Sequence, residues 1–282
     1  MKHSPVPLPA LVLALVLASV AAPLPAQTVA DDFSTAGALV GSTPDAGTGL
    51  WTQIGASAAS PLTVAGGSLA LAASSGQSAQ LNFAAGDVAA GTIYAGITFS
   101  VTPGTISSTS GTISTFFGFR SGTAATGDYE VAAGLFRPNG TAQTAGALPT
   151  TTSQFQVGFG DGAALPNGGT RWTETGTTGT SYRLVLAWNL DTDSARLWLN
   201  PTSELSAFTD IGSGLTGVAR GIFVRQGAAT SGQINLSNLQ VATDFATAAA
   251  IPEPSTYATA AGLAVLGLAW FRRHRARFGN NL

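Results

Sequence analysis

Hydrophobic and polar residues alternate along much of the chain between residues 27 and 250. In residues 92–101 (TIYAGITFSV) the apolar side chains fall on odd positions, and the even positions include Thr92, Thr98 and Ser100. Residues 182–190 (YRLVLAWNL) carry their apolar residues on even positions, with Arg183 and Asn189 between them. Because successive side chains of a strand point to opposite faces, this period of two predicts two long strands with one face each in a core.

Shorter alternating segments predict further strands. They centre on apolar residues two positions apart, namely Leu69 and Leu71, Leu81 and Phe83, Phe155, Val157 and Phe159, and Ile222 and Val224. Sequences rich in Gly, Asn and Pro, which favour turns, separate them. No segment of this body shows a convincing helical period. About ten to thirteen short strands at this spacing predict an all-β fold, a two-sheet jelly-roll sandwich.

One break in the alternation predicts an irregular strand. Ile234 and Leu236 lie on even positions, whereas Leu239 and Val241 lie on odd ones. An extra residue near positions 237–238 would restore the alternation, so we expect a β-bulge there.

Residues 191–194 (DTDS) lie between two predicted strands and are expected to form a four-residue hairpin loop. Asp and Ser favour turns because their side chains bond to the local backbone. Asp191 and Asp193 are also weak candidates for a calcium site, which would need further oxygen ligands from elsewhere. A turn is the favoured interpretation, and no metal or other cofactor is expected.

The first residues have the pattern of an export signal. Lys2 and His3 precede a 13-residue apolar run at 10–22 (ALVLALVLASVAA), and small residues and prolines follow it. Such a short run is typical of a cleaved secretory signal peptide. We expect residues 1–26 to be this signal, with cleavage after Ala26 or, as the alternative, after Ala30; a membrane anchor is the other interpretation.

Residues 251–277 combine a proline-containing stem, an apolar run and a basic cluster. The stem holds Pro252, Glu253 and Pro254; the apolar run is 257–271 (YATAAGLAVLGLAWF), and with Ser255 and Thr256 it is long enough to be a single transmembrane helix over 255–271. The cluster, within residues 272–277, consists of Arg272, Arg273, Arg275 and Arg277. Arginines favour the cytoplasmic side of a membrane, so we expect the body outside. Each proline holds the preceding residue extended, which predicts an extended stem.

This order of stem, apolar span and arginines resembles the PEP-CTERM sorting signal of Gram-negative bacteria. Pro252, Glu253 and Pro254 match the motif, and Arg272 and Arg273 match its basic end. The resemblance implies recognition by a membrane-embedded exosortase, cleavage near the motif, and transfer of the body to the cell surface or the extracellular polysaccharide. The expected organisation is a signal peptide (1–26), a β-sandwich (27–248) and a sorting signal (249–282). A plain single-span anchor is the alternative.

A second resemblance concerns the body. Residues 182–201 and 224–245 resemble the last third of concanavalin-like or laminin G-like jelly-roll domains. In these domains the first strand pairs near the last one, and residues 31–33 (DDF) fit that first strand.

Charge and composition exclude several classes of function. Residues 27–250 hold 13 carboxylates and seven arginines, a net charge of −6, with no lysine. This balance argues against nucleic-acid binding. The chain has no cysteine, so no disulfide supports the fold. Its two histidines, His3 and His274, lie in the terminal signals, so no Ser-His-Asp or Cys-His catalytic site can form in the body. We therefore expect a structural surface protein and not an enzyme.

Glycan binding is the alternative function. Trp198 lies on the same strand face as Arg196 and Asn200, opposite Leu197 and Leu199. An exposed tryptophan beside hydrogen-bonding groups suits a sugar, so these residues predict a possible glycan platform in a lectin-like module. A covered Trp198 would instead belong to a core. The partners expected are thus exosortase, the membrane before processing, and extracellular polysaccharide.

Overall fold

The computed structural model describes residues 27–250, apart from 48, 56–59, 73–75, 84–85, 107–113, 123–127, 137–150, 161–169, 172–174, 212–214 and 227–231. The expected signal peptide (1–26) and the segment 251–282, with the expected transmembrane helix, lie outside the described residues. Within the described part, no helix is both long and apolar enough to cross a membrane.

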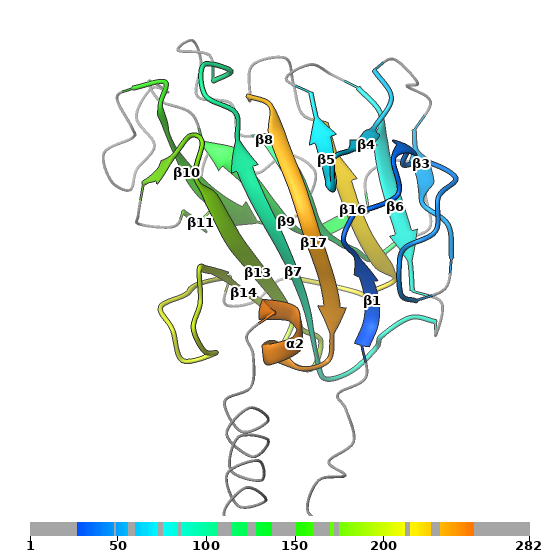
Figure 1. Ribbon diagram of the computed structural model, residues 1–282. Coiled ribbons are helices and arrows are strands. Elements are labelled where there is room, and N and C mark those ends of the chain that lie inside the picture. Colours follow the sequence, from blue (N-terminus) through cyan, green and yellow to red (C-terminus); the bar gives the residue numbers. More distant parts are fainter. Residues whose placement is uncertain are drawn as a thin grey trace, which may run out of the picture.

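The first of two sheets has nine strands, and each neighbouring pair is antiparallel (Figure 1). In spatial order they are β15 (Thr209–Ile211), β14 (Ser194–Leu199), β13 (Ser181–Asn189), β7 (Thr92–Val101), β17 (Ile234–Ala242), β5 (Ser68–Leu71), β4 (Thr63–Ala65) and β2 (Gly37–Ala38), with β1 (Gln27–Asp31) also paired to β17.

The second sheet has eight strands and packs behind the first. In spatial order they are β11 (Thr170–Arg171), β10 (Gln154–Gly160), β9 (Tyr129–Phe136), β8 (Ser114–Arg120), β16 (Gly221–Arg225), β6 (Ser78–Asn82) and β3 (Thr52–Ile54), with β12 (Gly176–Thr177) paired to β10.

One apolar core fills the space between the sheets. The rings of Trp188 in the first sheet and Phe119 in the second lie 6.2 Å apart, and those of Phe99 and Phe116 lie 5.4 Å apart. All four side chains are buried. Buried aromatic rings contribute large apolar areas, so these contacts hold the two sheets together. The predicted all-β, two-sheet jelly-roll sandwich is confirmed.

The alternating segments form the strands that they predicted. Residues 92–101 are β7, and the strand predicted at 182–190 is β13, one residue earlier. The hairpin loop after β13 accordingly covers residues 190–193, one residue before the predicted loop.

The predicted bulge and the pairing of the first strand are also present. The register between β17 and β7 shifts between Ser237 and Gln240, and Asn238 has a φ of 50°. β1 pairs with β17, where Asp31 lies opposite Leu239.

A short helix, α2 (Phe245–Ala249), is an addition that the alternation did not predict. Two residues separate it from β17, and Asp244 caps it by accepting a hydrogen bond from the Thr247 N–H. Aspartate at this position satisfies a backbone donor at the start of a helix. α2 packs on the outer face of the first sheet, against β7, β13 and β17. The packed chain thus reaches Ala249, one residue beyond the expected limit of the sandwich.

β1 begins and α2 ends at the same end of the sandwich (Figure 1). Gln27, the first residue of β1, pairs with Ala242, the last residue of β17, and α2 follows after two residues. We name this the basal end, defined by Gln27, Ala242 and Ala249. The opposite, apical end holds Val101 and Ser181, where β7 ends and β13 begins.

Candidate functional site

α2 closes a second, smaller core on the outer face of the first sheet. The Phe245 ring lies 5.0 Å from that of Trp198 and 5.7 Å from that of Tyr94, both edge-on. Val185 and Ala187 complete the floor. Trp198 faces away from Leu197, as the alternation predicts, but it is fully buried. Of its two interpretations, the structure therefore bears out the core, and an exposed Trp198 platform is wrong.

A glycine and an arginine let α2 approach the sheet. A Cβ on Gly96 would lie 1.8 Å from the carbonyl oxygen of Ala248, so only glycine fits beneath the helix. The Arg183 guanidinium donates to the carbonyls of Ala248 and Asn238 and to Thr98 Oγ1. Burial lowers the pKa of Arg183 to about 10, so it remains charged at neutral pH. These contacts fasten the last turn of α2 to β13 and β17.

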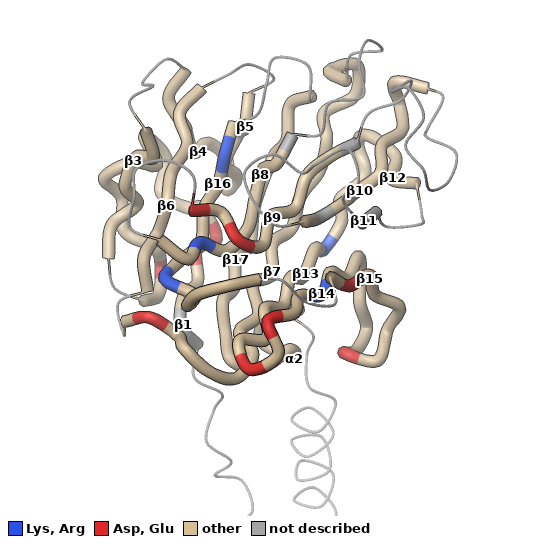
Figure 2. Tube along the Cα trace, turned by 180° about the vertical axis from the view of Figure 1, so that it is seen from behind, with Lys and Arg blue, Asp and Glu red and all other residues tan. Residues whose placement is uncertain are grey.

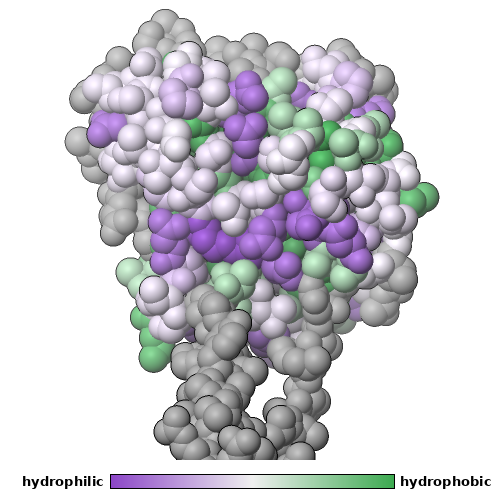
Figure 3. Space-filling view, in the orientation of Figure 1, coloured by the Kyte–Doolittle hydropathy of each residue, from purple (hydrophilic) through white to green (hydrophobic). Residues whose placement is uncertain are grey.

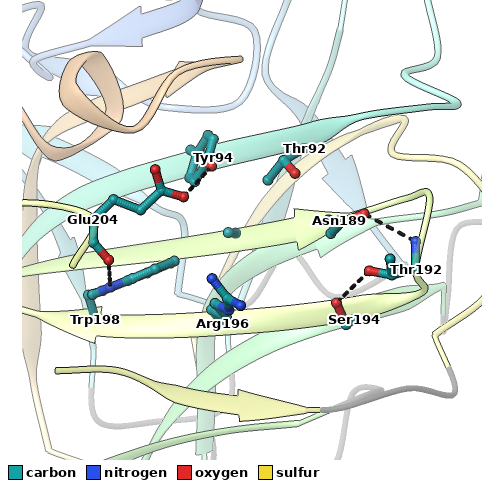
Figure 4. Close-up of a pocket in the computed structure, with 9 residues that line it drawn as sticks. Thr92, Tyr94, Asn189, Thr192, Ser194, Arg196, Trp198 and Glu204 are labelled. Carbon is teal, nitrogen blue, oxygen red and sulfur yellow. Dashed lines mark hydrogen bonds between the residues drawn. The ribbon is translucent and has the colours of Figure 1, made fainter. Parts of the chain in front are cut away.

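A hollow of about 240 Å³ opens beside this core (Figure 4). Its lining comes from β7, β13, β14 and the loop between β14 and β15, and consists of Thr92, Tyr94, Ala187, Asn189, Thr192, Ser194, Arg196, Trp198 and Glu204.

Glu204 forms one wall of the hollow. Its Oε1 accepts a hydrogen bond of 2.8 Å from the Tyr94 hydroxyl, and its carbonyl oxygen accepts one of 3.2 Å from Trp198 Nε1 (Figure 4). Burial is the larger cause of a raised pKa of Tyr94, and the hydrogen bond to Glu204 is the next. The hydroxyl therefore keeps its proton at neutral pH. The Glu204 carboxylate keeps further acceptor capacity for a ligand, because a carboxylate can accept several hydrogen bonds.

Arg196 supplies the positive charge of the hollow. Its guanidinium carbon lies 4.5 Å from the centroid of the Phe208 ring, a cation–π contact. In Figure 4 the side chain stands between Trp198 and Ser194, its neighbours on the outer face of β14. The side chain is exposed, so its five N–H donors can reach a molecule in the hollow.

The remaining polar groups come from the hairpin between β13 and β14. Asn189 Oδ1 accepts from the backbone N–H groups of Asp191 and Thr192, at 3.0 and 3.1 Å. The group that Asn189 offers a ligand is therefore its NH₂. The hydroxyls of Thr192 and Ser194 lie 2.8 Å apart and share one hydrogen bond. Together with Arg196 and Glu204, these groups supply both donors and acceptors, which suits a ligand rich in hydroxyl groups.

The structure brings only part of the predicted glycan platform together. Trp198 and Arg196 line the hollow, whereas Asn200 lies outside it. Asn200 has a φ of 49°, and its Oδ1 accepts a hydrogen bond of 2.7 Å from the Arg183 N–H. Asn200 thus shapes the strand end, and its place in a glycan platform stays a prediction.

Tyr94 and Glu204 were missed in the sequence. They lie 110 positions apart and meet only because the β14–β15 loop folds back over the outer face. The lone aromatic ring on the polar face of residues 92–101 was the one available signal.

Asp191 and Asp193 serve the hairpin turn. Asp191 Oδ1 accepts a hydrogen bond of 2.9 Å from the Gly91 N–H, and Asp193 has a φ of 51°. These features agree with the favoured turn interpretation. The expectation that they hold no metal stays a prediction.

Among the described residues, one group of three carboxylates has its oxygens close together: Asp31, Asp32 and Asp45 lie within 4.8 Å of one another. Asp31 is buried and accepts from Trp51 Nε1 at 2.8 Å and from the Phe33 N–H at 2.9 Å. Burial raises the pKa of Asp31, while the hydrogen bond to Asp45 lowers that of Asp32. Both oxygens of Asp31 thus accept hydrogen bonds within the protein. The bond from Trp51 connects β1 to the loop before β3.

Two carboxylates that could have served catalysis lie in separate places. Glu130 on β9 of the second sheet accepts from the backbone of Thr216 and from the Ser121 hydroxyl. Glu204 lies over the outer face of the first sheet. A glycosidase needs two carboxylates on either side of one bond, and these two do not share a site. Glu174 lies outside the described residues.

Comparison with known families identifies the segment that follows α2. Residues 250–273 match the PEP-CTERM protein-sorting motif. The chain carries a PEP-CTERM sorting motif. The matched residues include Pro252, Glu253 and Pro254 and the first two arginines of the basic cluster, Arg272 and Arg273. A PEP-CTERM motif indicates export by way of a membrane-anchored intermediate, processing by an exosortase, and delivery to the cell surface.

Solved structures resemble the body only in fold. The potassium-bound carbohydrate recognition domain of Emp46p has 10% identity over 69% of this chain and 89% of its own, with a TM-score of 0.43. An alginate lyase from Alteromonas sp. 272 has 7% identity over 62% and 86%, with a TM-score of 0.37. The binding domain of botulinum neurotoxin serotype D has 9% identity over 77% and 48%, with a TM-score of 0.38. No curated protein matches the chain.

Proposed function

We propose that the protein is a non-catalytic component of the cell surface or extracellular polysaccharide of a Gram-negative bacterium, released there by exosortase. The position of the PEP-CTERM motif carries this proposal. α2 ends at Ala249, Ala250 caps it, and the motif occupies residues 250–273. Cleavage beyond Ala250 would therefore leave the sandwich and its α2 contacts intact.

The non-catalytic role rests on the chemistry that residues 27–250 can supply. They contain no histidine and no cysteine, which are the usual general bases and nucleophiles. Glu130 and Glu204 hold neighbouring loops through hydrogen bonds. These hydrogen bonds account for the positions of both glutamates without a catalytic role.

Mass spectrometry of the surface-located protein tests the proposal. The expected product lacks the apolar segment and the arginines; intact Leu282 would contradict it. Replacing Arg272, Arg273, Arg275 and Arg277 by glutamine should lower processing, because the positive charges orient the span. The matched variant with four lysines keeps the charge and should be processed.

Glycan binding in the hollow is a second candidate function. It is favoured by the convergence of Arg196, Glu204 and Asn189 on a space of about 240 Å³. A glycan array probed with the released protein tests it. Arg196→Ala and Glu204→Gln should each abolish any signal, while Ser181→Ala, on the same face at the apical end, should not. Binding that survives both hollow variants would place the glycan elsewhere.

A further inference from the structure

The large apolar side chains that the described residues expose are three, and two of them share one loop. They are Leu205, which is 95% exposed, Leu50 at 52% and Phe208 at 43%. Single exposed leucines are common on soluble proteins, so exposure alone means little. The common location of Leu205 and Phe208, next to the segment that leads to the PEP-CTERM motif, is the informative observation.

Leu205 and Phe208 belong to the β14–β15 loop at the basal end. Leu205 follows Glu204, whose carboxylate accepts from Tyr94, and Tyr94 pairs with Ala242 at the end of β17. Figures 1 and 2 both show this loop level with α2. In the space-filling view a small hydrophobic group lies at the lower left, over this loop (Figure 3).

Leu50 lies apart from this loop. The indole N–H of its neighbour Trp51 donates to Asp31 Oδ2, and Asp31 ends β1 four residues beyond the basal Gln27. Leu50 therefore takes no part in the basal surface.

The sequence after α2 keeps this end close to a membrane. Ala250 and Ser255 are five positions apart, so their Cα atoms can separate by at most about 18 Å. The apolar segment 255–271, the expected span of the PEP-CTERM signal, begins there. Before processing, the basal end is therefore the part of the sandwich nearest the bilayer.

We propose that the basal end rests on the outer surface of the inner membrane until the chain is processed, with Leu205 and Phe208 in contact with lipid. This inference rests on the membrane-anchored intermediate of the proposed function. The contact can be weak, because a short tether keeps the two surfaces at a high effective concentration.

The charges at this end define the nature of the contact. Glu204, Asp191 and Asp244 lie at or near the basal end, and Figure 2 shows acidic segments at α2 and at the loop before β15. Their charge opposes anionic lipid headgroups. The contact is thus apolar, and two side chains are too few to hold the body once the tether is cut. Cleavage by exosortase would therefore be sufficient to free the basal end from the membrane.

The absence of cysteine makes a direct test possible. Leu205→Cys and, as a matched control, Ser181→Cys are made in the full chain, and each is labelled with an environment-sensitive fluorophore. Ser181 is exposed on the same sheet face but at the apical end. The proteins are reconstituted without exosortase in vesicles of phosphatidylethanolamine and phosphatidylglycerol.

The label at position 205 should emit at shorter wavelength and be quenched by headgroup-labelled lipid, whereas the label at 181 should not. Cutting the chain after Ala250 should abolish the difference. Flotation of the vesicles separates the two hypotheses: protein that does not float overturns the membrane-anchored intermediate, and floating protein with a water-exposed label at 205 overturns the contact. A label shielded only when exosortase is added would assign the surface to that enzyme and also overturn the lipid contact.

Discussion

At the scale of single residues, burial decides what Trp198 does. Strand alternation places its side chain on the outer face but cannot tell whether anything covers that face. Phe245 and Tyr94 cover it, and the indole N–H donates to the Glu204 carbonyl. Sugar recognition, if it occurs in this hollow, therefore depends on Arg196 and Glu204 and not on an exposed indole ring.

Trp198→Ala should destabilise the protein by about 3–5 kcal/mol, because it removes a buried aromatic ring and leaves a cavity. Trp198→Phe keeps part of the ring and should cost less. Urea denaturation of the released protein measures both. A loss below about 1 kcal/mol for the alanine variant would mean that the ring is not buried as described.

Asp31 gives a second prediction at this scale. Asp31→Ala leaves the buried Trp51 Nε1–H and the Phe33 N–H without their acceptor, which should cost about 1–3 kcal/mol. Asp31→Asn keeps one acceptor oxygen and should cost less. Equal losses for the two variants, measured by urea denaturation, would show that these hydrogen bonds do not stabilise the fold.

The pKa of Asp31 adds a pH dependence. Burial raises this pKa above the usual 3.8, so the folded protein binds the proton more tightly than the unfolded chain. The stability of the wild type relative to Asp31→Asn should therefore fall as the pH rises from 3.8 through the folded-state pKa, and stay constant above it. A relative stability that rises over this interval would contradict the shift.

At the scale of elements, the sequence predicted the strands well and the helix not at all. The period of two in residues 92–101 is sufficient for β7, since that strand is long and pairs on both sides. α2 has five residues, too few for a 3.6-residue period to show. Its position depends on Gly96 and Arg183, which are far from it in sequence. The hollow beside it was unpredictable for the same reason.

Gly96→Ala tests how α2 is held. The added Cβ would meet the Ala248 carbonyl at 1.8 Å, so α2 must move, at a cost of about 1–3 kcal/mol for overpacking. Tryptophan fluorescence should shift to longer wavelength as Phe245 leaves Trp198. Ser100→Ala, on the same face of β7 beyond α2, is the control and should leave the spectrum unchanged. An unchanged spectrum in Gly96→Ala would refute the tight fit.

The hairpin between β13 and β14 gives another prediction for an element. If Asp191 and Asp193 form a turn without an ion, a chelator should leave the melting temperature of the released protein unchanged. A bound calcium ion would stabilise the folded state in proportion to its occupancy. A clear drop with chelator that calcium restores would assign a metal to this protein.

At the scale of the whole molecule, the arrangement of the strands places the start of β1 and the end of α2 together. This pairing, expected from the jelly-roll resemblance, gives the sandwich a basal end at which the chain continues in sequence into the PEP-CTERM motif. Alternation alone could not show which side chains gather there, because Leu205 and Phe208 lie in a loop outside the alternating strands. The length of the tether, the residues between Ala250 and Ser255, then determines how close the whole sandwich stays to the membrane.

Lengthening the tether separates sorting from membrane contact. A flexible Gly/Ser linker of about 20 residues between Ala250 and Ile251 has an average span of about 25 Å and leaves Pro252 to Pro254 unchanged. Sorting should continue, because exosortase reads the motif. Lipid quenching at position 205 should decrease, since the effective concentration of the basal end at the bilayer falls with tether length. The same linker placed in the exposed turn at Gly66 and Gly67 should leave the quenching unchanged. Undiminished quenching with the long tether would mean that the basal end binds the bilayer by itself, and the weak, tether-dependent contact would be wrong.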